Sequence, residues 1–165
     1  MALESTIAPV VEIREARSDE GPVLALVQKE ASLAALGHIF PPERYPYPRA
    51  VVQAHWAAAV RDPAKRTLIA LNGDRPVGAA CVYEEWLEGL YISSEYWGTG
   101  LAGELHDRAL EIVRELGSGL CRLWVLEDNV RARRFYERRG WREDGRSRVV
   151  EFPPYPLDVG YTLDF

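Results

Sequence analysis

The sequence has little of several features that would define specialised classes of protein. It has two cysteines, Cys81 and Cys121, both in apolar surroundings, so neither a disulfide framework nor a cysteine metal site is predicted. Its apolar runs fall short of the roughly 18 residues that span a membrane, and its first residues lack the basic segment of a signal peptide. With 25 acidic and 20 basic residues, its net charge of −5 disfavours a nucleic-acid surface.

What is present is the composition of an ordinary globular chain. Hydrophobic residues make up 47% and charged residues 27% of the 165 positions. We therefore expect a single domain over residues 1–165, with a frayed terminus over 1–9. We also expect a cytoplasmic protein with no membrane, nucleic-acid or metal partner, and we leave a homodimer open.

The hydrophobic pattern predicts strands and helices in the order β-α-α-β-β-β-α-β-α-β-β. The predicted strands are 10–16, 67–71, 77–85, 87–92, 120–126, one from Trp141, and 158–165. The predicted helices are one from a cap at Ser18 or Asp19 to about Gly37, then 49–60, one from the glycine loop to 116, and 129–139. Hairpin-linked strands are antiparallel, whereas the unit 87–126 should be a parallel crossover. The fold class is therefore α/β, with a mixed, mostly antiparallel central sheet.

The stretch 87–116 combines a strand, a glycine loop and a helix. The helical face carries apolar residues at regular intervals, namely Leu101, Leu105, Ala109, Ile112 and Leu116. Free backbone N–H groups and the positive end of the helix dipole converge where such a helix begins. We therefore predict an anion site, for a phosphate group, at Gly98–Gly103.

The same glycines spell G-x-G-x-x-G, the pattern of a dinucleotide-binding unit that would bind NAD. Two observations disfavour that interpretation. Residues 93–97 separate the strand from Gly98, whereas the first glycine of such a unit lies at the end of the strand. A long segment also precedes a motif that normally opens its domain.

Two segments together resemble the GNAT superfamily of N-acetyltransferases. The loop Trp97–Gly103 resembles its pyrophosphate loop, Q/R-x-x-G-x-G/A, with Gly100 and Ala102 matching and Trp97 standing where Gln or Arg is usual. The pattern N-x-x-A-x-x-x-Y-x-x-x-G-[FW] matches at every fixed position, through Asn129, Ala132, Tyr136, Gly140 and Trp141. The predicted order of elements also agrees with the GNAT-like acyl-CoA N-acyltransferase fold along nearly the whole chain.

The resemblance implies transfer of an acetyl group from acetyl-CoA to a primary amine, by direct attack through a tetrahedral intermediate. It implies that acetyl-CoA contacts the backbone of Leu90, Tyr91 and Ile92, the loop residues Trp97, Gly98, Thr99, Gly100, Leu101, Ala102 and Gly103, and Asn129, Ala132, Arg133 and Tyr136. Asn129 is equally well explained as a helix N-cap. A non-catalytic module that binds or senses acyl-CoA remains the alternative from another functional class.

Two residues are candidates for proton transfer. Tyr136 could protonate the departing thiolate, although a core tyrosine beside Phe135 would give the same pattern. A base must deprotonate the incoming amine, and Glu88 is preferred to Glu84 and Glu85 because the family often carries a glutamate just before the strand residues that bind the arm of CoA. Three acids near a strand end are also common on a solvated surface.

The acceptor is predicted to be a small-molecule or peptide amine, but the sequence does not identify it. Residues predicted to line its pocket are His38, Phe40, Tyr83 and Trp86, with Tyr45, Tyr47 and Trp56 as further aromatic candidates. We expect His55 and His106 to lie on the surface.

Overall fold

The computed structural model describes residues 10–165, so the frayed terminus predicted for residues 1–9 lies outside the described residues. The strands are β1 (Val11–Glu15), β2 (Lys65–Asn72), β3 (Arg75–Tyr83), β4 (Trp86–Ile92), β5 (Leu120–Leu126), β6 (Arg142–Val149) and β7 (Leu157–Asp164). The helices are α1 (Gly21–Ala35), α2 (Arg49–Ala59), α3 (Leu101–Glu115) and α4 (Val130–Arg138), with a 3-10 turn η1 at Ser94–Tyr96. This order confirms the predicted one. Within residues 10–165 no helix is both long and apolar enough to cross a membrane.

All the strands belong to one seven-stranded sheet in the order β1-β2-β3-β4-β5-β7-β6. Neighbouring strands are antiparallel except β4 and β5, which are joined through α3 and run parallel. The predicted mixed, mostly antiparallel sheet and the parallel crossover over 87–126 are therefore confirmed.

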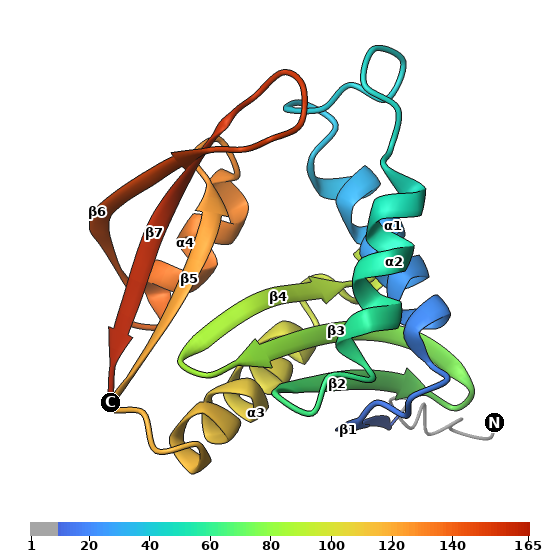
Figure 1. Ribbon diagram of the computed structural model, residues 1–165, viewed down its shortest axis with the longest axis vertical. Coiled ribbons are helices and arrows are strands. Elements are labelled where there is room, and N and C mark those ends of the chain that lie inside the picture. The colour runs from blue at the N-terminus through green and yellow to red at the C-terminus, as the bar shows by residue number, and fades with distance from the viewer. Residues whose placement is uncertain (1–9) are drawn as a thin grey trace, which may run out of the picture.

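Helices cover both faces of the sheet, so its inner strands are apolar on both sides. Along β2, Leu68 and Ala70 pack in a core cluster with α3, whereas Ile69 and Leu71 pack in a second cluster with α1 and α2. Alternate residues of a strand point to opposite faces, which explains why neighbours in sequence enter different clusters. Figure 1 shows α1 and α2 side by side on one side of the molecule, and α4 on the opposite side together with β5, β6 and β7.

The feature that shapes the middle of the molecule is the separation of β4 from β5. The two strands pair only at Trp86 and Arg122 and then diverge (Figure 1). Beyond that pair each strand presents an edge whose backbone groups have no partner strand, and such an edge can bind an extended chain with amide groups. We call the space between the diverging strands the wedge.

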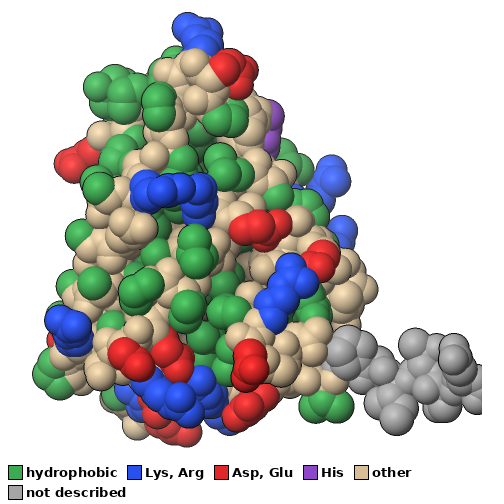
Figure 2. All heavy atoms as spheres, turned by 90° about the vertical axis from the view of Figure 1, so that its right-hand side faces the viewer, with side chains coloured by type: hydrophobic (Ala, Val, Ile, Leu, Met, Phe, Trp, Pro, Cys, Tyr) green, Lys and Arg blue, Asp and Glu red, His purple; other side chains and the backbone are tan. Residues whose placement is uncertain are grey.

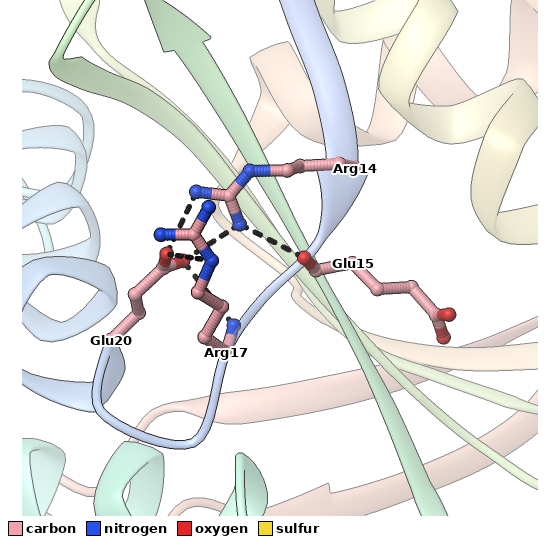
Figure 3. Close-up of polar contacts among 4 residues, drawn as sticks. All are labelled: Arg14, Glu15, Arg17 and Glu20. Atoms are coloured by element: carbon pink, nitrogen blue, oxygen red, sulfur yellow. Dashed lines mark hydrogen bonds and ion pairs between the residues drawn. The ribbon is translucent and has the colours of Figure 1, made fainter.

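The start of α1 is fixed by Glu20 rather than by the predicted cap at Ser18 or Asp19. Glu20 is the N-cap residue but makes no side-chain cap bond. Its carboxylate instead accepts hydrogen bonds from Arg14 at 2.7 and 3.1 Å, and Arg14 also donates to the carbonyl oxygen of Glu15 (Figure 3). The bond from Arg14 is the main cause of a lowered pKa of Glu20. An ion pair therefore joins β1 to the residue at which α1 begins.

Candidate active site

The wedge encloses a cavity of about 610 Å³. Its lining comes from β4, β5, α4 and neighbouring elements, namely Leu36, His55, Tyr83, Trp86–Tyr91, Leu123–Leu126, Asn129, Ala132, Tyr136, Arg148 and Asp158. At the end where the strands meet, the rings of Trp86 and Trp124 stack with centroids 6.2 Å apart. The Arg146 guanidinium lies 5.1 and 4.9 Å from the two ring centroids. This end of the wedge is thus filled with aromatic side chains.

The backbone of β4 has its free groups on the wedge side at alternate residues. The Trp97 indole N–H donates to the carbonyl oxygen of Ile92 at 3.2 Å, whereas the N–H of Ser93 donates to Val77 of β3 at 2.9 Å. Since the N–H and carbonyl of one strand residue point the same way and neighbours alternate, Ile92 and Leu90 face the wedge and Tyr91 faces β3. Two of the three predicted backbone contacts are therefore turned toward the wedge.

The glycine loop lies at the start of α3. Gly98 and Gly100 have φ angles of +77° and +91°, which glycine adopts without strain. Gly100 is the N-cap of α3, so the first N–H groups of that helix, from Leu101 onward, have no partner within it. These groups give the loop the donors that an anion needs.

An arginine lies beside this loop, but it is not the predicted one. The guanidinium carbon of Arg131 lies 3.4 Å from the centre of the Trp97 ring. Arg133 instead donates to the Tyr161 hydroxyl at 2.9 Å and to the carbonyl oxygen of Glu127 at 3.0 Å. Cofactor binding by Arg133 stays a prediction, and the stacking of Arg131 on Trp97 was not predicted from the sequence.

Asn129 caps α4, which confirms the interpretation of this residue as an N-cap. Its Oδ1 accepts a hydrogen bond from the N–H of Ala132 at 3.3 Å. Both residues also line the wedge. The cap therefore fixes the start of α4, the helix that carries Tyr136.

Tyr136 is 8% exposed and lines the wedge from α4. Phe135 and Trp141 pack against its ring with centroids 5.2 and 5.6 Å away. Burial is the main cause of a raised pKa of Tyr136, so its hydroxyl is protonated at neutral pH. The side chain is both a core residue and a protonated donor at the cavity wall.

A second cavity, of about 750 Å³, lies between α1, α2, the loop 37–48 and the turn at Phe152. The two cavities share Leu36, His55, Glu88, Tyr91 and Arg148, and we call this set the junction. Of the residues predicted to contact the acceptor, Phe40 lines the second cavity and Tyr83 and Trp86 line the wedge. His38 lines neither, and its Nε2 donates to the Asp128 carbonyl oxygen at 2.9 Å.

The junction contains a carboxylate, Glu88, and an imidazole, His55, and Lys65 pairs with Glu88 from outside the junction. The Glu88 carboxylate lies 2.9 Å from Lys65 Nζ and 3.4 Å from the Cys81 sulfur. Desolvation first, and Lys65 second, lower the pKa of His55, so this imidazole is neutral at neutral pH. Glu84 and Glu85 line neither cavity. His55 thus joins Glu88 as a group able to accept a proton.

His55 is exposed, as predicted, and it also lines both cavities, which the sequence analysis did not predict. Val52 and Trp56 mark the buried face of α2, and His55 follows Val52 by three residues, so it lies at the margin of that face. This spacing was the signal in the sequence that could have placed His55 near the buried face of α2. The prediction for His106 is wrong, because its side chain is 2% exposed and its Nε2 accepts a hydrogen bond from Trp141 Nε1 at 2.9 Å.

Comparisons with known proteins agree with this architecture. The peptidyl-lysine N-acetyltransferase YjaB of Escherichia coli is 33% identical over 85 residues, which cover 51% of this chain and 54% of that protein. The chain thus spans about half the length of the curated relatives it matches.

Solved structures show the same fold at lower identity. A PaiA N-acetyltransferase from Thermoplasma acidophilum, in complex with coenzyme A, has a TM-score of 0.72 at 19% identity and covers 94% of this chain and 99% of its own. The solution structure of E. coli YjaB has a TM-score of 0.71 at 21% identity, with coverage of 93% and 97%. A sequence profile of the Acetyltransferase (GNAT) family matches residues 30–141. On this match, the chain belongs to the GNAT family of acetyltransferases.

Proposed function

We propose that this protein transfers an acetyl group from acetyl-CoA to a primary amine by direct attack within the wedge. The observation that carries the proposal is the single β4–β5 pair at Trp86 and Arg122, beyond which the backbone groups of Leu90 and the N–H of Ile92 face the wedge without a partner strand. The Ile92 carbonyl oxygen already accepts a bond from Trp97. The amide-bearing arm of acetyl-CoA can pair with this edge. Its pyrophosphate can reach the N–H groups at Gly98–Gly103, next to the same strand.

Arg131 supports phosphate binding in a chain that lacks the usual Gln or Arg at the start of the loop. Trp97 occupies that position and holds the Arg131 guanidinium against its ring. The positive charge therefore comes from α4 instead of from the loop. A guanidinium held against a residue of the loop is a suitable partner for a phosphate oxygen bound there.

The amine must lose a proton before it attacks. An alkyl amine has a pKa near 10.4, so only about one molecule in a thousand is neutral at pH 7. Glu88 is the proposed base, and His55 lies at the same junction as a second group that can accept the proton. Both are reached from the wedge and from the second cavity.

The transfer then involves one bond formed and one bond broken. The amine nitrogen bonds to the thioester carbonyl carbon, and the oxyanion that develops is stabilised by an N–H of β4, with Ile92 as the proposed donor. The carbon–sulfur bond then breaks, and the Tyr136 hydroxyl gives its proton to the sulfur. The amine gives one proton to Glu88 before it attacks and a second proton to solvent as the intermediate collapses, and solvent restores the proton of Tyr136.

Direct transfer is favoured over a covalent acyl-enzyme. Cys81 is the cysteine nearest the junction, and its sulfur lies beside the Glu88 carboxylate. Desolvation is the main cause that raises the pKa of the Cys81 thiol to about 12. A thiol that stays protonated is a poor nucleophile, so the amine itself is the attacking group.

The experiment that tests the proposal combines binding with turnover. Calorimetry should detect binding of acetyl-CoA but not of NAD, and release of the CoA thiol should depend on an added amine. The amine panel includes a lysyl peptide, because a relative is named a peptidyl-lysine N-acetyltransferase. Binding of acetyl-CoA without thiol release for any amine would favour the non-catalytic sensing module, and binding of NAD alone would favour a dinucleotide site.

A further inference from the structure

The second cavity has walls that are largely apolar and aromatic. The loop 37–48 contributes Phe40, Tyr45 and Tyr47, α2 contributes Val51, and Phe152 closes the cavity from the β6–β7 side. An aryl or branched alkyl group can bury most of its surface against such walls, and burial of apolar area favours binding. The cavity is therefore suited to a bulky apolar group.

The charges that line this cavity are mainly basic. Among the residues that the structure describes, Glu88 is the one acid in its lining, whereas Arg44 and Arg148 both contribute guanidinium groups. Arg148 pairs with Asp158 at 3.0 Å, but within residues 10–165 Arg44 makes no ion pair. A second cation on a bound acceptor would find no free carboxylate here and would be repelled by Arg44.

The position of Glu88 determines which end of the bound acceptor lies nearest the thioester. Glu88 belongs to the junction, where the second cavity meets the wedge that holds the proposed thioester. The amino group must reach this point to attack. The rest of the acceptor then occupies the second cavity, between the aromatic walls.

We infer that the acceptor is a monoamine on a bulky apolar body, and that amines with a second cationic group are selected against. This inference rests on the acetyl transfer proposed above. The outer surface agrees with it, because acidic and basic side chains are interspersed on the face that Figure 2 presents, on the side of α1 and α2. That face offers no broad acidic field that would attract polycations.

The test measures kcat/KM for thiol release with the wild-type protein. The panel contains 2-phenylethylamine and isopentylamine as apolar monoamines, spermidine and kanamycin as polycations, and a lysyl peptide. We expect kcat/KM for the better apolar monoamine to exceed that for either polycation by about tenfold or more, the discrimination that lost apolar contacts and an unpaired charge produce. Equal or greater kcat/KM for a polycation or for the lysyl peptide would overturn the inference.

A matched pair of variants links this selectivity to the cavity. Val51 and Leu26 are both exposed hydrophobic residues on helices, but only Val51 lines the second cavity. V51D adds a carboxylate to the cavity and should raise the ratio of kcat/KM for spermidine to that for 2-phenylethylamine several-fold. L26D should leave this ratio unchanged. An unchanged ratio in V51D would mean that these walls do not choose the acceptor.

Failure of the inference can be told apart from failure of the proposed function. If acetyl-CoA binds but no amine releases thiol, the proposed acetyl transfer is wrong and the inference falls with it. If polycations are acetylated well and apolar monoamines are not, acetyl transfer stands and the inference about the acceptor is wrong.

Discussion

Lys65 Nζ lies 2.9 Å from the Glu88 carboxylate at the junction of the two cavities. Desolvation lowers the pKa of Lys65, but the hydrogen bond and the charge of Glu88 outweigh it, so the net pKa is raised and the ammonium stays charged. The same ammonium helps to keep His55 neutral. The ion pair thus keeps Lys65 charged, and the ammonium adds to the desolvation that lowers the pKa of His55.

The first prediction concerns the base. If Glu88 takes the proton of the amine, E88Q will flatten the acid limb of the profile of kcat/KM against pH. A limb that persists but moves to lower pH would identify His55 as the base instead, because the Glu88 charge raises the pKa of His55 and its removal lets that pKa fall. H38Q is the control, since His38 lines neither cavity, and its profile should match that of the wild type.

The second prediction concerns Arg131 and the loop. R131Q should raise the dissociation constant of acetyl-CoA by about tenfold, which corresponds to loss of one charge-assisted contact of roughly 1.5 kcal/mol. R134Q is the matched control, because Arg134 is an exposed arginine on the same helix, whereas it is Arg131 that stacks on Trp97 of the loop. Calorimetry of both variants checks the prediction. If R131Q and R134Q lost the same affinity for acetyl-CoA, Arg131 would contribute only through the overall positive charge of the helix.

The third prediction concerns the buried pair of His106 and Trp141. Trp141 Nε1 donates to His106 Nε2, so the ring proton must lie on Nδ1, which is 2.9 Å from the Asp107 carboxylate. W141F leaves Nε2 buried without its donor and should lower the free energy of unfolding by about 1–3 kcal/mol. Urea unfolding followed by far-UV circular dichroism measures this loss. An unchanged free energy of unfolding in W141F would mean that the hydrogen bond between Trp141 and His106 does not stabilise the fold.

The same histidine predicts a dependence of stability on pH. Desolvation is the main cause of a lowered pKa of His106 in the folded state. The unfolded chain therefore binds a proton near pH 6.5 that the folded chain does not, and the stability that is present above about pH 6.5 is lost as the pH falls toward the lowered pKa. Between pH 7.5 and pH 5.5, roughly one unit on either side of the unfolded pKa, H106Q should lose less of its free energy of unfolding than the wild type and H38Q do.

Most of the fold was predictable because its signals are local. The helical face from Leu101 to Leu116 and the glycine loop before it predicted α3, and the strand–helix–strand order over 87–126 predicted the parallel crossover. Contacts between distant segments were not predictable in this way. The stacking of Arg131 on Trp97, the burial of His106 under Trp141 and the position of His55 beside Glu88 each join elements that only the tertiary structure brings together. The cap at Glu20 was missed for the same reason, since its partner Arg14 comes from β1.

The central claim is that acetyl transfer occurs in the wedge, with Tyr136 as the acid. The most direct test measures, for the wild type and Y136F, both the rate of amine-dependent CoA release in a single turnover and the dissociation constant of acetyl-CoA. Y136F keeps the aromatic packing but has no hydroxyl proton to give. We predict a rate lowered by about 10²–10⁴-fold, the usual contribution of a general acid, with little change in the dissociation constant. An unchanged rate of CoA release in Y136F would contradict this account.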